Sequence, residues 1–165
     1  MSNGIELDGI GTFVLDDRMG WPVGERQLDV TPLGVTGVFV LDDPDADLDL
    51  ASAAMRRFIA LSPADLATST PHVHAYYHDS VEAGWAPDLA LSSPDDVWRH
   101  VTPPREFVVH VRDGVAHVQL ECECAWEPEH GLDLVFRDGD TISKVGQFDG
   151  HLHHLDRDVV YPGSP

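Results

Sequence analysis

The chain has 165 residues and a formal net charge of −19, from 29 acidic against 10 basic residues. This charge repels nucleic-acid phosphates and anionic membrane surfaces, so we expect neither as a partner and favour a basic protein instead. The length and the hydrophobic share of 42% predict one globular domain over 1–165. We expect frayed ends at the first few residues and over about 158–165.

Several classes of protein are excluded by what the sequence lacks. The first residues do not form a secretory signal, and no apolar stretch is long enough to span a membrane. Two cysteines do not make a disulfide framework, so we expect a reduced, cytoplasmic protein. No nucleotide-binding loop, nucleophile elbow or complete metal-ligand pattern is present, and we expect no cofactor.

The first quarter of the chain predicts a β-meander. Short apolar runs at Gly11–Leu15 and Gly37–Leu41 flank a weaker alternation at Arg26–Val30. The acidic segment Asp42–Asp47 lacks the glycine and the terminal glutamate of a calcium-binding loop. It is therefore interpreted as a solvated lead into a helix over about 48–60, where acids suit the positive helix N-terminus.

Three Ser-Pro or Thr-Pro pairs mark the next helix starts. They stand at Ser62-Pro63, Thr70-Pro71 and Ser93-Pro94. His74 and His78 have the spacing of helical zinc ligands, but no third ligand is evident, so a solvent-facing pair is favoured.

From residue 106 the apolar pattern alternates, and two Asp-Gly pairs predict two hairpins. Around Asp113-Gly114, the predicted register pairs core residues and sets His110 opposite His117. Around Asp138-Gly139, it sets Arg137 against Asp140 and Asp133 against Lys144, the only lysine.

The stretch 121–131 holds both cysteines and the most distinctive residues. Strand alternation points Cys122 and Cys124 into the core and Glu121 and Glu123 outward, so the cysteines are interpreted as packing residues. A zinc site formed by Cys122, Cys124, His130 and one of the tail histidines His151, His153 or His154, with His153 as the first choice, is the alternative.

Glu127, Glu129 and His130 follow the end of the same strand. They could perform acid–base catalysis or simply form a connecting loop in which Trp126 closes the core edge. The candidate functional surface comprises Trp126, Glu127, Glu129, His130, Asp149 and His151.

The same stretch carries a family resemblance. Cys124, Trp126, Glu129, His130 and Gly131 resemble the Cys-x-Trp-x-x-Glu-His-Gly signature of an uncharacterised bacterial domain family. Tyr76-Tyr77 and the closing Val145-Gly146…Asp149-Gly150 are similar to the layout of that family. The resemblance implies a compact α+β domain, and some similar small bacterial proteins serve as immunity or accessory partners of toxins.

Together these patterns predict an α+β fold. We expect an antiparallel sheet, made of the N-terminal meander and the two C-terminal hairpins, with two to three helices on one face. The favoured function is a protein-binding module, such as an immunity-type inhibitor of a basic partner. The alternatives are a metal-dependent or acid–base enzyme using 122–130, and a structural domain from an acidic proteome.

Overall fold

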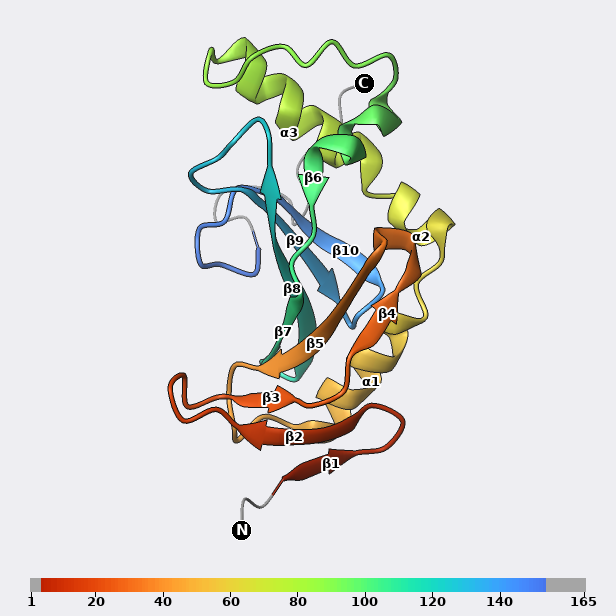
Figure 1. Ribbon diagram of the computed structural model, residues 1–165, viewed down its shortest axis with the longest axis vertical. Coiled ribbons are helices and arrows are strands. Elements are labelled where there is room, and N and C mark those ends of the chain that lie inside the picture. The colour runs from red at the N-terminus through yellow and green to blue at the C-terminus, as the bar shows by residue number, and fades with distance from the viewer. Residues whose placement is uncertain (1–3, 154–165) are drawn as a thin grey trace.

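A computed structural model describes residues 4–153 (Figure 1). Residues 1–3 and 154–165 lie outside the described range. The C-terminal segment predicted to fray, over about 158–165, and His154 are among them. The strands are β1 (Ile5–Leu7), β2 (Gly11–Leu15), β3 (Pro22–Gly24), β4 (Leu28–Val30), β5 (Val35–Leu41), β6 (Val101–Thr102), β7 (Glu106–Arg112), β8 (Val115–Cys124), β9 (Leu132–Arg137) and β10 (Thr141–Gly146). The helices are α1 (Leu48–Ile59), α2 (Pro63–Ala67) and α3 (Thr70–Glu82), with 3₁₀ helices η1 (Thr31–Leu33) and η2 (Pro94–His100).

The strands form one sheet in the order β1-β2-β3-β5-β7-β8-β9-β10, with β4 beside β5 and β6 beside β8. The α+β prediction is confirmed, with one departure from an antiparallel sheet. β5 and β7 run parallel. The chain leaves β5, passes through all three α-helices and η2, and returns beside β5 in the same direction, as a long helical crossover allows.

The helices begin at the predicted polar residues. Asp47 caps α1 by accepting hydrogen bonds from the backbone N–H groups of Asp49 and Leu50. Ser62 and Asp65 form a reciprocal capping box at α2. The helix predicted after Ser93-Pro94 forms as a 3₁₀ helix.

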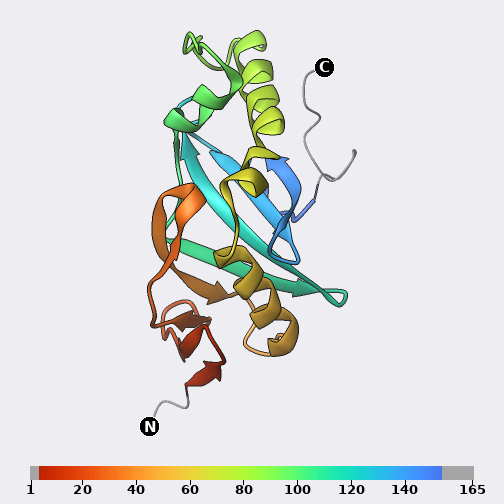
Figure 2. The same ribbon diagram turned by 90° about the vertical axis from the view of Figure 1, so that its right-hand side faces the viewer.

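The core lies between α1 and one face of the sheet. Phe58 of α1 packs against Phe39, Phe107 and Phe136, with ring centroids 6.0, 5.3 and 5.5 Å away. Each of these side chains is at most 1% exposed, and edge-on aromatic packing adds to the burial of their large apolar area. The β1–β3 strands lie at one end of the long axis, and α3 with η2 lies at the other (Figures 1 and 2).

The register of the first C-terminal hairpin is confirmed, including Val109 opposite Val118 and His110 opposite His117. The register predicted for the second hairpin is wrong. Arg137 lies opposite Thr141, and an irregularity between Ile142 and Lys144 shifts the strands again, so that Lys144 lies opposite Val135. One extra turn residue and one β-bulge account for the two shifts.

No helix within residues 4–153 combines the length and apolar character needed to cross a membrane.

Candidate functional site

A hollow of about 410 Å³ lies at the end of β8 that leads into the 127–131 turn. Four glutamates line it, together with His130 and both cysteines. We call it the acidic groove, defined by Glu121, Glu123, Glu127, Glu129 and His130. Neither lysine nor arginine is among its lining residues, so its walls offer carboxylate oxygens to a cationic group.

Strand alternation on β8 places these side chains as predicted. Glu121 and Glu123 are exposed, whereas Cys122 and Cys124 are 2% and 7% exposed and belong to the core. Burial raises the pKa of the Cys124 thiol to about 11, and it raises the pKa of Cys122 further. Both cysteines are therefore neutral thiols at neutral pH, which makes them poor nucleophiles.

Glu127 shapes the turn that closes the groove. Its Oε1 accepts hydrogen bonds from the backbone N–H groups of Glu129 and His130 at 3.1 and 3.3 Å. The His130 ring lies 3.4 Å from the same oxygen, and the Glu127 side chain is only 14% exposed. Because these contacts occupy this oxygen, the Glu127–His130 pair is better suited to hold the turn than to transfer protons.

Trp126 does not belong to the predicted surface. Its side chain is 0% exposed, and its ring packs edge-on against Tyr76 and Tyr77 of α3 at 6.1 and 5.8 Å. Tyr76 also donates a hydrogen bond from its hydroxyl to the backbone O of Gly131 at 3.1 Å. Trp126 stands two residues after Cys124, so it continues the alternation that points Cys122 and Cys124 into the core. This period of two residues could have predicted that Trp126 is buried.

A row of polar side chains crosses the face of the sheet that does not pack against the core. This row was not predicted from the sequence. We call it the polar row, and its members are Asp42, His110, Gln119, Asp133, Lys144 and Asp149. They come in spatial order from the end of β5, from β7, β8, β9 and β10, and from the segment after β10.

The first half of the polar row is anchored by Asp42, whose side chain is 7% exposed rather than solvated as predicted. Its Oδ2 accepts a hydrogen bond from His110 Nδ1 at 2.6 Å and also contacts Arg112. The other ring nitrogen of His110 lies 2.8 Å from Gln119 Oε1, while Gln119 Nε2 donates to both Asp133 oxygens. Each ring nitrogen of His110 therefore lies within hydrogen-bond distance of a side-chain oxygen.

The second half of the polar row is centred on Lys144, which is 0% exposed. Its Nζ donates to Asp133 Oδ2 at 2.8 Å, to Asp149 Oδ1 at 2.6 Å and to the backbone O of His151 at 2.7 Å. All three ammonium donors are used, so Lys144 has a structural role. The predicted surface residues Asp149 and His151 accept these bonds, and neither lines the acidic groove.

The sequence held a signal for this row. His110, His117 and Gln119 stand on the non-core face of the hairpin around Asp113-Gly114. The only lysine stands in a strand that was predicted to pair with the strand of Asp133. Asp42 could not be assigned to it, because its partners are 68 and 70 residues away.

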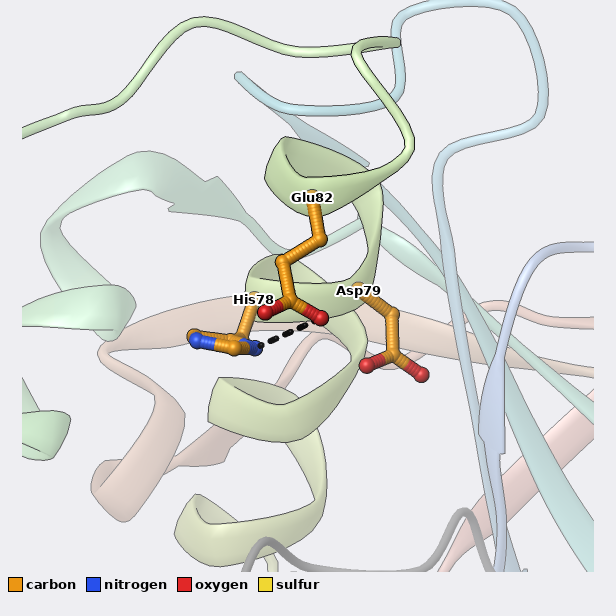
Figure 3. Close-up of side chains that lie close together, drawn as sticks. All are labelled: His78, Asp79 and Glu82. Atoms are coloured by element: carbon orange, nitrogen blue, oxygen red, sulfur yellow. Dashed lines mark ion pairs between the residues drawn. The ribbon is translucent and has the colours of Figure 1, made fainter.

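Among the described residues, the structure does not bring Cys122, Cys124, His130 and His153 together. Within residues 4–153, one group of three potential ligands has its ligand atoms within 4.8 Å of one another, and it contains none of Cys122, Cys124, His130 and His153. That group is His78, Asp79 and Glu82 on the exposed side of α3 (Figure 3). His78 Nδ1 lies 3.7 Å from Glu82 Oε2, whereas His74 packs against Tyr77.

Comparison with known proteins places the chain in a family. The family described as a domain of unknown function (DUF6985) matches residues 9–152. The chain belongs to this family. The matched range includes the whole sheet except β1, and it holds both the acidic groove and the polar row. No curated protein and no solved structure matches the chain.

Proposed function

We propose that this protein is a protein-binding module whose acidic groove receives a basic side chain or segment of its partner. The observation that carries the proposal is the convergence of Glu121, Glu123, Glu127 and Glu129 on one hollow that arginine and lysine do not line. Carboxylates gathered in a concave site focus the electric field and attract cations more strongly than the same charges spread over a surface.

The rigid base of the groove supports the same proposal. Cys122 and Cys124 anchor β8 in the core, and Tyr76 holds the carbonyl of Gly131. A binding surface that is already ordered loses less conformational entropy when the partner arrives. The partner class that suits this site is a basic protein, and the family resemblance to small bacterial proteins favours a cytoplasmic, immunity-type role.

The enzyme alternative has less support. Glu127 is occupied by two backbone donors, the cysteine thiols are buried, and Lys144 has no donor left. A nucleophile next to a base is therefore not assembled within the described groove.

Partner binding at several salt concentrations tests the proposal, using basic proteins encoded by neighbouring genes. In the groove variant, Glu121, Glu123 and Glu129 are changed to Gln. In the matched control variant, the same number of charges is removed by changing Asp8 and Asp17 to Asn and Glu25 to Gln. These three residues are exposed and lie in the loops that follow β1, β2 and β3.

We expect the groove variant to bind at least tenfold more weakly and the control variant to bind almost normally. The affinity of the unmodified protein should fall as salt rises, because ions screen charges over about 8 Å at physiological strength. An affinity that is indifferent to salt, or that falls equally in both variants, would refute the proposal.

A further inference from the structure

A second hollow, of about 520 Å³, lies at the other end of β8 from the acidic groove. The outward side chains of β8 connect the two sites, with His117 in this hollow, Gln119 in the polar row and Glu121 in the acidic groove. The turn of the β7–β8 hairpin, the end of β9 and the segment after β10 form its walls.

The charge of this hollow is opposite to that of the chain. Two arginines and three histidines line it, with one carboxylate among them. We call it the cationic hollow, and its charged and titratable lining residues are Arg112, Asp113, His117, Arg137, His151 and His153. In a protein with 29 acids and 10 basic residues, such a gathering is not expected from composition.

Nearby carboxylates contact the two arginines and His151 of the hollow, but they do not occupy all the N–H donors of the arginines. Asp42 contacts Arg112, and Asp138 Oδ2 lies 3.7 Å from Arg137 Nε. Asp149 is engaged by Lys144, and its Oδ1 lies 3.5 Å from His151 Nδ1. A guanidinium carries five N–H donors, so each arginine retains donors for an anion that enters the hollow.

His117 supplies a polar group in the wall. Its Nδ1 is buried and has no hydrogen-bond partner within the described chain, and an unpaired buried nitrogen is costly unless a ligand or water reaches it. Val115 and Leu152 add apolar surface beside these charges. The combination suits a ligand with a charged end and an apolar body.

We propose that the cationic hollow binds a small organic anion, with its phosphate or carboxylate group held by Arg112, Arg137 and His117 and its apolar part against Val115 and Leu152. The geometry of the lining carries this proposal, and it is independent of the acidic groove. Planar, multi-donor guanidinium groups recognise both phosphate and carboxylate oxygens.

Binding takes up a proton in this arrangement. Burial lowers the pKa of His117, and His110, Arg137 and His153 lower it further, while Asp138 acts in the opposite direction. The other charged or titratable groups that line the hollow are Arg112, Asp113 and His151. An anion beside His117 favours its protonated form, so affinity should rise as pH falls from about 7.5 to about 6.

Titration followed by NMR amide shifts and by calorimetry tests the proposal with four probes. These are phenyl phosphate, benzoate, inorganic phosphate and the uncharged benzyl alcohol. We expect one saturable site for phenyl phosphate or benzoate, with the largest shifts around residues 112–117, 137 and 150–153. Whichever of the two binds more tightly identifies the anionic group, and benzyl alcohol should not bind.

Arg137→Gln should weaken binding at least tenfold. His117→Gln should reduce the pH dependence measured with benzoate, which stays ionised over this pH range, so that a change in affinity reports on the protein. Arg99→Gln is the matched control, because Arg99 is an exposed arginine on η2 that also pairs with an aspartate. Unchanged amide spectra outside the hollow show that the variants fold. Failure of both organic anions to saturate, an equal loss in Arg99→Gln, or binding of inorganic phosphate as tight as that of phenyl phosphate would overturn the proposal.

Discussion

Lys144 Nζ lies 2.8 Å from Asp133 Oδ2, and neither side chain is exposed. Removing two charges from water is costly, and their attraction offsets that cost only when the remaining donors and acceptors are satisfied. Here Asp149, the carbonyl of His151 and Gln119 complete the set. The pair therefore links β9, β10 and the segment after β10.

Replacing Lys144 by Met should be strongly destabilising. The change leaves Asp133 buried without its cation, which costs roughly 3–5 kcal/mol of unfolding free energy. The double variant Lys144→Met with Asp133→Leu should lose less, because it removes both buried charges. Urea unfolding followed by tryptophan fluorescence measures both, with the exposed Arg99→Met as control. A loss below about 1 kcal/mol in Lys144→Met would contradict the role assigned to the pair.

Asp149 should make stability depend on pH in the acid range. Burial raises the pKa of Asp149, but the Lys144 hydrogen bond and the N–H of His151 outweigh it, so the native pKa lies below 3.8. A lowered native pKa contributes stability that is present above 3.8 and is lost as pH falls through the native value.

Asp149→Asn tests this expectation. The variant should be less stable than the unmodified protein at pH 7, and the difference should shrink below pH 3.8. Unfolding free energies measured across this range, with the exposed Asp95→Asn as control, provide the comparison. A difference that stays constant down to the lowest pH would show that the charge of Asp149 is irrelevant.

The two cysteines should react slowly with an aromatic disulfide reagent in the native protein. Both are buried, and the raised pKa of Cys124, about 11 against 9.0, leaves little thiolate at pH 8. Labelling should become rapid for both thiols in urea, which serves as the control. Each Cys→Ala change should cost on the order of 1–2 kcal/mol. Fast labelling of both thiols without unfolding would contradict their place in the core.

Gly131 should tolerate alanine poorly. Its φ is +64°, and a Cβ at this position would lie 2.4 Å from the carbonyl oxygen of Cys122. Gly114 is the matched control, because its φ is +75° and a Cβ there meets nothing within 4 Å. Gly114→Ala should cost about 1 kcal/mol through its backbone conformation alone. Gly131→Ala should cost at least about 2 kcal/mol more in thermal or urea unfolding, and equal losses would show that the contact relaxes easily.

The sequence by itself determined the local elements and the faces of their side chains. Alternation with a period of two predicted that His110 lies opposite His117 and that Cys122 and Cys124 are buried, and the structure shows both. The pattern is sufficient because adjacent residues of a strand point to opposite sides of the sheet. Polar residues before prolines located the helix starts, since caps act within a few residues. The composition of the acidic groove also follows from the sequence, because its members stand within one stretch of the chain.

Only the tertiary structure decided which distant residues meet. The β-bulge before Lys144, the parallel pairing of β5 with β7 and the burial of Asp42 beside His110 depend on packing across the whole sheet. The cationic hollow likewise joins Arg112 to His151 and His153 through the path of the chain after β10. Alternation gives the side of the sheet on which a residue lies, whereas its partner across that face depends on strand order and register, which local patterns do not contain.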